Sequence, residues 1–100
     1  MKNTNTAKIG KDKSLKELQT IPGVGKSIAN DLYNIGVKKV ADLEGKSPAS
    51  LYKRLNRFSG VKNDVCVLYT FRCAVYYATE PDLQKEKLNW WYWKDKVYID

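Results

Sequence analysis

The sequence predicts an all-α protein, a compact domain of five to six helices. Apolar residues recur at helical spacing through most of the chain, as in Ile28, Leu32 and Ile35, and this spacing places them on one face of a helix. No stretch of useful length alternates apolar and polar residues as a strand would. One hundred residues correspond to a single small domain, which glycines and prolines divide into short helical units.

The N-terminal region divides into an arm and a first helix. Residues 1–13 are polar and rich in lysine, without apolar periodicity, so we expect a disordered basic arm before one folded domain of residues 14–100. A helix is predicted from Ser14 to Thr20, because Ser14 and Glu17 have the spacing of a capping box.

A glycine-rich turn separates this helix from a second one, which is expected from about Lys26 to Asn34. The turn reads Ile21-Pro22-Gly23-Val24-Gly25-Lys26-Ser27. The first amides of a helix have no acceptor inside it, and the positive end of the helix dipole lies there. Such donors beside the Lys26 cation favour a phosphate site. The alternative is a tight turn that binds no ligand.

Residues 37–58 predict a second helical pair, a degenerate copy of the first. A short helix is expected from about Lys39 to Glu44, and Gly45-Lys46-Ser47-Pro48 stands where the first pair has its two-glycine turn. With Ser47 as N-cap and Pro48 at the first helical position, the next helix is predicted to reach Arg57. We expect it to bury Leu51, Leu55 and Phe58.

Residues 63–79 predict the central helix of the domain, capped by Asn63 or Asp64. This helix is apolar nearly all round, as expected for one that its own domain or a partner chain covers on most sides. Cys66 and Cys73 lie about 10 Å apart along it, which is too far for a disulfide. We expect both to be buried as small apolar residues.

Residues 82–95 predict a short helix followed by an aromatic run. Trp90-Trp91-Tyr92-Trp93 is expected to cover the core as a lid. The alternative for Trp90, Trp91 and Trp93 is stacking on the bases of a single strand.

Positive charge is concentrated in the half that holds the glycine turn. The net charge is +7; residues 1–62 carry 13 Lys or Arg against 5 Asp or Glu, and residues 63–100 carry 5 against 6. This distribution favours a polyanionic partner, although a solvated lysine surface gives the same balance. If the partner is a nucleic acid, the further cations expected to contact it are Lys38, Lys39, Lys46, Lys53, Arg54 and Arg57.

Several function classes are excluded by composition. The chain has no histidine, which removes Ser-His-Asp triads, Cys-His dyads and zinc sites with histidine ligands. No catalytic residue stands out, so we expect a protein that is not an enzyme and that needs no cofactor. The start has no signal-peptide pattern and no apolar run could span a membrane, which predicts a cytoplasmic protein without a membrane partner.

The segment Leu-Gln-Thr-Ile-Pro-Gly-Val-Gly-Lys-Ser-Ile-Ala at 18–29 resembles the helix-hairpin-helix motif of DNA repair and replication proteins, over about residues 15–36. The resemblance implies that the amides at Gly23, Val24 and Gly25 face a DNA phosphate and that Lys26 and Ser27 contact the same strand. Tight duplex binding often uses two such hairpins, and the second pair here lacks the glycines.

The same resemblance implies a monovalent cation site. The backbone carbonyls of Gln19, Ile21 and Val24 would hold a K⁺ or Na⁺ ion that bridges to the phosphate.

Two later blocks are similar to a narrower group. Asp-Val-Cys-Val-Leu-Tyr-Thr-Phe-Arg-Cys-Ala-Val-Tyr-Tyr-Ala at 64–78 and Leu-Asn-Trp-Trp-Tyr-Trp-Lys-Asp at 88–95 resemble the small bacterial pathogenicity locus family, some of whose members are described as mitomycin-resistance proteins. The resemblance covers about residues 15–95. It also suggests kinship with the helical C-terminal domain of competence regulators, which shares the hairpin.

These observations predict non-sequence-specific binding of nucleic acid, in the first place DNA, in a role related to DNA repair or competence. Contacts to the backbone do not read bases, so RNA would be held in the same way. The alternative is a protein-interaction adaptor or homodimer that uses the apolar helix 63–79 and the tryptophan cluster, with a purely structural turn.

Overall fold

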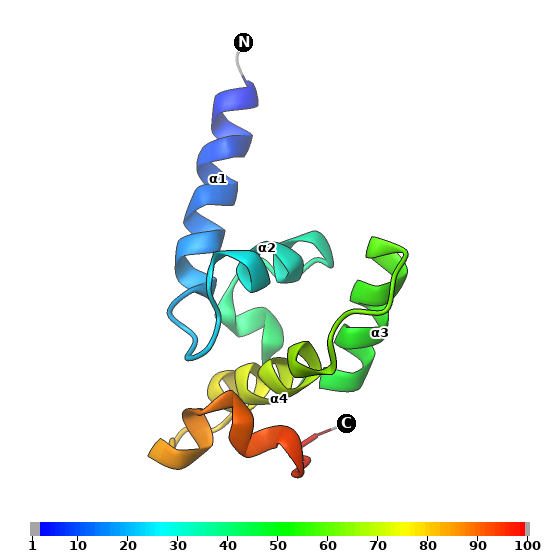
Figure 1. The fold of residues 1–100 in the computed structure, drawn as a ribbon. Helices are drawn as coiled ribbons and strands as arrows, with labels where there is room; N and C mark the ends of the chain where they lie inside the picture. Colours follow the sequence, from blue (N-terminus) through cyan, green and yellow to red (C-terminus); the bar gives the residue numbers. More distant parts are fainter. Residues whose placement is uncertain (1–2, 100) are drawn as a thin grey trace.

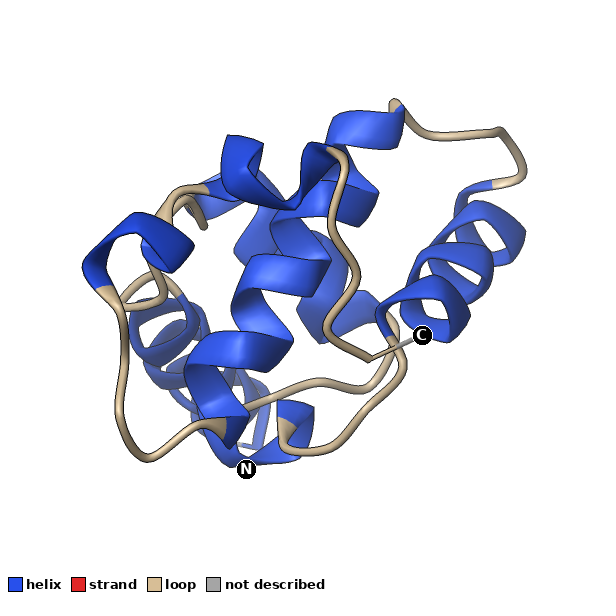
Figure 2. Ribbon diagram, turned by 90° about the horizontal axis from the view of Figure 1, so that it is seen from below, coloured by secondary structure: helices blue, strands red, loops and turns tan. Residues whose placement is uncertain are grey.

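The computed structural model describes the backbone of residues 3–99 and the side chains from Gly10 to Ile99 (Figure 1). Within these residues the chain forms four α-helices, three short 3₁₀ helices and no strand, which confirms the all-α class (Figure 2). Two of the short predicted helices, those near residues 39–44 and 82–89, are 3₁₀ turns in the structure. The elements are α1 (Asn3–Leu18), α2 (Lys26–Asn34), η1 (Val40–Leu43), α3 (Pro48–Ser59), α4 (Val65–Thr79), η2 (Lys85–Leu88) and η3 (Trp90–Lys94).

The first helix differs from the prediction, because α1 begins at Asn3 and not at Ser14. Residues 3–13 are therefore helical where a disordered arm was predicted, and α1 extends away from the rest of the molecule (Figure 1). No proline precedes Pro22, so nothing in the covalent chain stops the helical ladder from continuing upstream. Met1 and Lys2, also assigned to the arm, lie outside the described residues.

The predicted capping box of Ser14 and Glu17 is consequently wrong. Ser14 lies inside α1, and the Glu17 carboxylate accepts a hydrogen bond from the amide of Val40, at 2.7 Å. Glu17 therefore closes the start of η1, and in doing so it ties α1 to the second helical pair.

Helix α4 occupies the centre of the molecule, as predicted. One side packs into the main apolar core, where Phe71, Ala74 and Val75 meet Leu18, Leu32, Leu43, Leu51 and Leu55. The other side contributes Cys73 and Tyr76 to an aromatic cluster with Trp93. Beyond its first turn, most of its apolar surface is thus covered within the same chain, by the core helices on one side and by the C-terminal segment on the other.

The helix starts of α3 and α4 agree with the prediction. Ser47 Oγ accepts a hydrogen bond from the amide of Ser50 at 3.1 Å, with Pro48 at the first position of α3. Asp64 Oδ1 accepts one from the amide of Cys66 at 2.8 Å.

Three residues expected in the core are exposed instead. Phe58 is 60% exposed, because it lies in the last turn of α3, at the end that projects away from α4 (Figure 1). Cys66 lies in the first turn of α4 and is also exposed. Trp91 is 60% exposed although Trp93, two residues later, is 3% exposed, so the aromatic run covers the core only in part.

Candidate functional site

The glycine turn between α1 and α2 is anchored by apolar side chains. Ile21 and Val24 are buried in the core, and the amide of Val24 donates to the carbonyl of Ile21 at 3.0 Å. Gly23 between them has a φ of +83°, a conformation that side chains disfavour. Gly23 is therefore required by the backbone of the turn.

Gly25 is different, because nothing in the fold requires a glycine there. Its φ of −91° and ψ of −171° lie in the extended region, which any residue adopts. A Cβ added at Gly25 would meet no atom within 4 Å apart from its immediate neighbours in the chain. Gly25 is the N-cap of α2, and it brings no side chain to satisfy the first amides of the helix. The start of α2 is thus open, both chemically and sterically.

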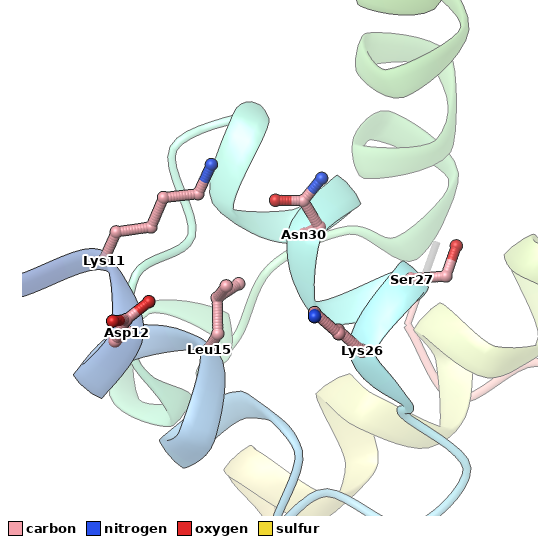
Figure 3. A pocket seen from close by; sticks show the side chains of 6 residues that line it. All are labelled: Lys11, Asp12, Leu15, Lys26, Ser27 and Asn30. Atoms are coloured by element: carbon pink, nitrogen blue, oxygen red, sulfur yellow. The ribbon is translucent and has the colours of Figure 1, made fainter. Parts of the chain in front are cut away.

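Lys26 and Ser27, the first two residues of α2, are exposed beside these amides. They border a pocket of about 700 Å³ between α1 and α2, whose other lining residues are Lys11, Asp12, Leu15 and Asn30. Lys11 and Asn30 extend toward each other from the two helices, with Leu15 between them, whereas the Ser27 hydroxyl points away from the pocket (Figure 3). The site therefore combines two lysines and open backbone donors with one carboxylate, Asp12.

Two lysines that lie against the ring of Tyr33 extend this positive surface along α2. The ammonium groups of Lys11 and Lys38 lie 5.4 and 5.2 Å from the centre of that ring, at cation–π distance. Sequence reasoning missed Tyr33, Asn30 and the contribution of α1 to this pocket. Their proximity depends on how α1 packs against α2, for which the sequence carries no local signal.

The predicted cations of α3 lie at the other end of α2. Arg54 Nη1 donates to the carbonyl of Ile35, the C-cap of α2, at 3.1 Å, about 15 Å of helix away from Gly25. Arg54 thus has a structural contact although its side chain is exposed, as are those of Lys53 and Arg57. The structure does not bring these three side chains into the pocket beside Lys26.

The carbonyls predicted to hold a monovalent cation have free acceptor capacity. That of Ile21 accepts one hydrogen bond, from Val24, and those of Gln19 and Val24 accept none within the described residues. Since a carbonyl oxygen has two lone pairs, all three can serve as ligands. The residues fit a K⁺ or Na⁺ ion in their chemistry, and the cation site stays a prediction.

The C-terminal segment braces the turn from behind. A Cβ on Gly23 would lie 3.6 Å from Trp90 Cδ1 and 3.9 Å from Thr70 Cγ2. Cys73 Sγ lies 4.0 Å from the carbonyl oxygen of Pro22 and 3.6 Å from that of Lys87, and burial raises the pKa of this thiol to about 11. The turn, α4 and the segment before η3 therefore meet at one buried, neutral thiol.

Comparison with known proteins identifies a family. The profile of a family described as "Pathogenicity locus" matches residues 11–97. Over 59 residues, 59% of this chain, the sequence is 36% identical to the mitomycin resistance protein McrB of Streptomyces lavendulae, and the match covers 56% of that relative. No solved structure matches the chain. Among the described residues, no helix has both the length and the apolar character needed to cross a membrane.

Proposed function

The chain belongs to the pathogenicity locus family, and from that premise we propose that it binds nucleic acid, in the first place DNA, through the phosphate backbone at the start of α2. The proposed role is binding without sequence specificity and without a catalytic step. The helix-hairpin-helix resemblance of residues 15–36 belongs to this proposal, as does a role in DNA repair or competence.

The observation that carries the proposal is the open start of α2. Gly25 has neither a backbone conformation nor a packing contact that calls for glycine, yet the residues preferred at this position carry a side chain that accepts one of the first amides. A phosphate oxygen is the kind of acceptor that such donors and the helix dipole attract. The absence of a side chain at this position is thus explained by a ligand that approaches the backbone closely.

Electrostatics supports the same site. Lys26 lies beside the open amides, and Lys11 reaches the same pocket from α1. Each phosphate neutralised by such contacts contributes about 0.9 to the slope of log affinity against log salt concentration on duplex DNA. Asp12 opposes an anion within the pocket, so we assign the phosphate to the amide end, at Gly25 and Lys26. A cation held by the carbonyls of Gln19, Ile21 and Val24 would add positive charge there.

The test is a fluorescence-anisotropy titration of a short labelled DNA duplex at low and at physiological salt. We expect Gly25→Asp to abolish binding, because its carboxylate caps α2 and repels phosphate. The matched control is Ser50→Asp, which places the same charge in the first turn of α3, on an exposed residue. Equal binding by the two variants would refute the site, and competition with single strands and structured RNA identifies the preferred nucleic acid.

If the protein is instead a protein-interaction module, its interface would be the exposed apolar patch at the α3–α4 connection and not the face of α4 that the chain itself covers. The apolar character of α4 is accounted for by its central position, whereas Phe58, Val61 and Val65 are exposed around the α3–α4 connection. If this patch joins two copies of the chain, sedimentation will show a dimer that Phe58→Ser dissociates. A monomer at high concentration would argue against that homodimer.

A further inference from the structure

Trp91 stands apart from the other aromatic residues near the C-terminus. It is 60% exposed, whereas Trp93 is buried and Trp90 and Tyr92 are half-buried. An indole gains most from burial of its large apolar surface, so the core does not account for Trp91. Its neighbour Trp90 meets it edge to face, with ring centres 5.8 Å apart.

The 3₁₀ helix η3, which carries Trp91, is fixed at Trp93 by two hydrogen bonds and a ring contact. Arg72 Nη1 donates to the carbonyl of Trp93 at 2.9 Å, and Trp93 Nε1 donates to the carbonyl of Lys87 at 2.9 Å. The Trp93 ring packs against Tyr76 of α4, with ring centres 5.4 Å apart. An exposed aromatic ring on a rigid support loses little conformational freedom when a ligand stacks on it.

Trp91 is linked to the glycine turn by its neighbour Trp90, which contacts both. Trp90 contacts the position of Gly23, with 3.6 Å between its Cδ1 and a Cβ built on that glycine. In Figure 1 the turn between α1 and α2 descends toward the C-terminal segment, and both lie along α4. The fold therefore brings an exposed indole close to the turn that leads into the open start of α2.

We propose that Trp91 is a stacking platform for an unpaired base of a nucleic acid whose backbone is held at the start of α2. This inference rests on the proposed function and restricts its ligand to nucleic acids that have unpaired bases. In an uninterrupted duplex both faces of an internal base are already stacked, whereas a single strand or a junction offers a free face. The ligand class is therefore single-stranded nucleic acid, or a duplex with a single-stranded extension. Aromatic stacking of this kind does not depend on base identity, in keeping with a backbone grip.

The experiment compares a labelled single strand with the corresponding blunt duplex. We expect Trp91→Ala to weaken single-strand binding about tenfold, the size found for loss of one base–aromatic stack, and to leave duplex affinity within about twofold. Trp91→Phe should retain most of the single-strand affinity. The control is Phe58→Ala, which removes an aromatic ring of the same 60% exposure elsewhere and should change neither affinity. Circular dichroism checks that all variants keep the fold.

The outcomes separate this inference from the function on which it rests. If Gly25→Asp abolishes binding but Trp91→Ala leaves single-strand affinity unchanged, the phosphate site stands and the stacking platform is refuted. Equal losses on the single strand and the duplex also refute stacking on an unpaired base. If the wild-type protein binds neither probe, both proposals fail, and Trp91 becomes part of a surface for another class of partner.

Discussion

The starts of α2 and α3 differ in how their first amides are treated: the start of α3 is closed by a side chain, and the start of α2 is open. At α3, Ser47 Oγ accepts the amide of Ser50, and Pro48 has no amide hydrogen to leave unsatisfied. At α2, Gly25 caps the helix without a side chain, and Lys26 follows with its amide free of any acceptor inside the helix.

The start of α3 thus stabilises the fold, whereas the start of α2 leaves its first amides available to a ligand. The residue before α3 satisfies the helix locally, and Pro48 is itself buried in the molecule. Gly25, the residue before α2, satisfies none of the first amides with a side chain, although it could accommodate a capping side chain without strain. A chain that would gain stability from serine at this position and carries glycine instead is typical of a functional site.

The largest effect is expected when α2 is closed in the way that α3 already is. In Gly25→Ser the new hydroxyl should accept one of the first amides and stabilise the protein by a few tenths of a kcal/mol. The same hydroxyl competes with phosphate for those donors, so DNA affinity should fall about tenfold, since hydrogen bonds to a charged group contribute roughly 1.5–3 kcal/mol. Thermal unfolding and anisotropy titration measure the two effects on one sample.

The opposite signs make this substitution informative. A variant that is more stable and binds less tightly cannot owe its lost affinity to unfolding. Undiminished binding in Gly25→Ser would mean that the first amides of α2 do not touch the ligand, and the comparison between the two starts would then be purely structural.

The converse experiment opens α3. Ser47→Ala removes the cap of Ser50 and should cost about 1 kcal/mol of unfolding free energy. We expect no change in DNA affinity, because Pro48 reduces the number of free donors and the Arg54 guanidinium already donates to the carbonyl of Ile35. The measurement is a chemical denaturation curve beside the same titration. A large loss of affinity without loss of structure would extend the site to the second pair.

A smaller effect is expected from the carboxylate beside the open start. Asp12→Asn removes the one negative charge that lines the pocket of Lys11 and Lys26, and should raise DNA affinity about threefold at low salt, as expected for a single screened charge near a surface. The control is Asp82→Asn, an equal charge change at an exposed residue of the loop before η2. If both variants gain equally, net charge alone is responsible and Asp12 has no special position.

Much of the fold follows from local signals in the sequence. The caps Ser47 and Asp64 and the apolar run of α4 are readable because each depends on residues a few positions apart. Glu17 shows where this fails: its spacing from Ser14 predicts a local capping box, but the carboxylate accepts the amide of Val40, 23 residues away. A local pattern cannot tell which helix start a carboxylate will reach once the chain has folded.

The candidate site was predictable to a similar degree. The open amides of α2 follow from the glycine turn itself, whereas the pocket with Lys11 and Asn30 requires knowledge of how α1 packs on α2. Exposure was the least predictable property: Phe58 and Trp91 look like core residues by type. Their exposure is decided by how α3 and η3 lie relative to α4, which no spacing in the sequence encodes.

The smallest effect is expected at α4, whose start is closed by a charged side chain. Hydrogen bonds from Cys66 lower the pKa of Asp64 below its ordinary 3.8. A lowered folded-state pKa contributes stability above the unfolded value, and this contribution disappears as the pH falls through the folded value. Asp64→Asn caps α4 about equally well but does not titrate. Wild type should therefore melt at a slightly higher temperature than the variant at neutral pH, and the difference should shrink once the pH falls below 3.8. A difference in melting temperature that is independent of pH would show that Asp64 closes α4 by shape alone, as an uncharged cap does, and that charge plays no part at the capped starts.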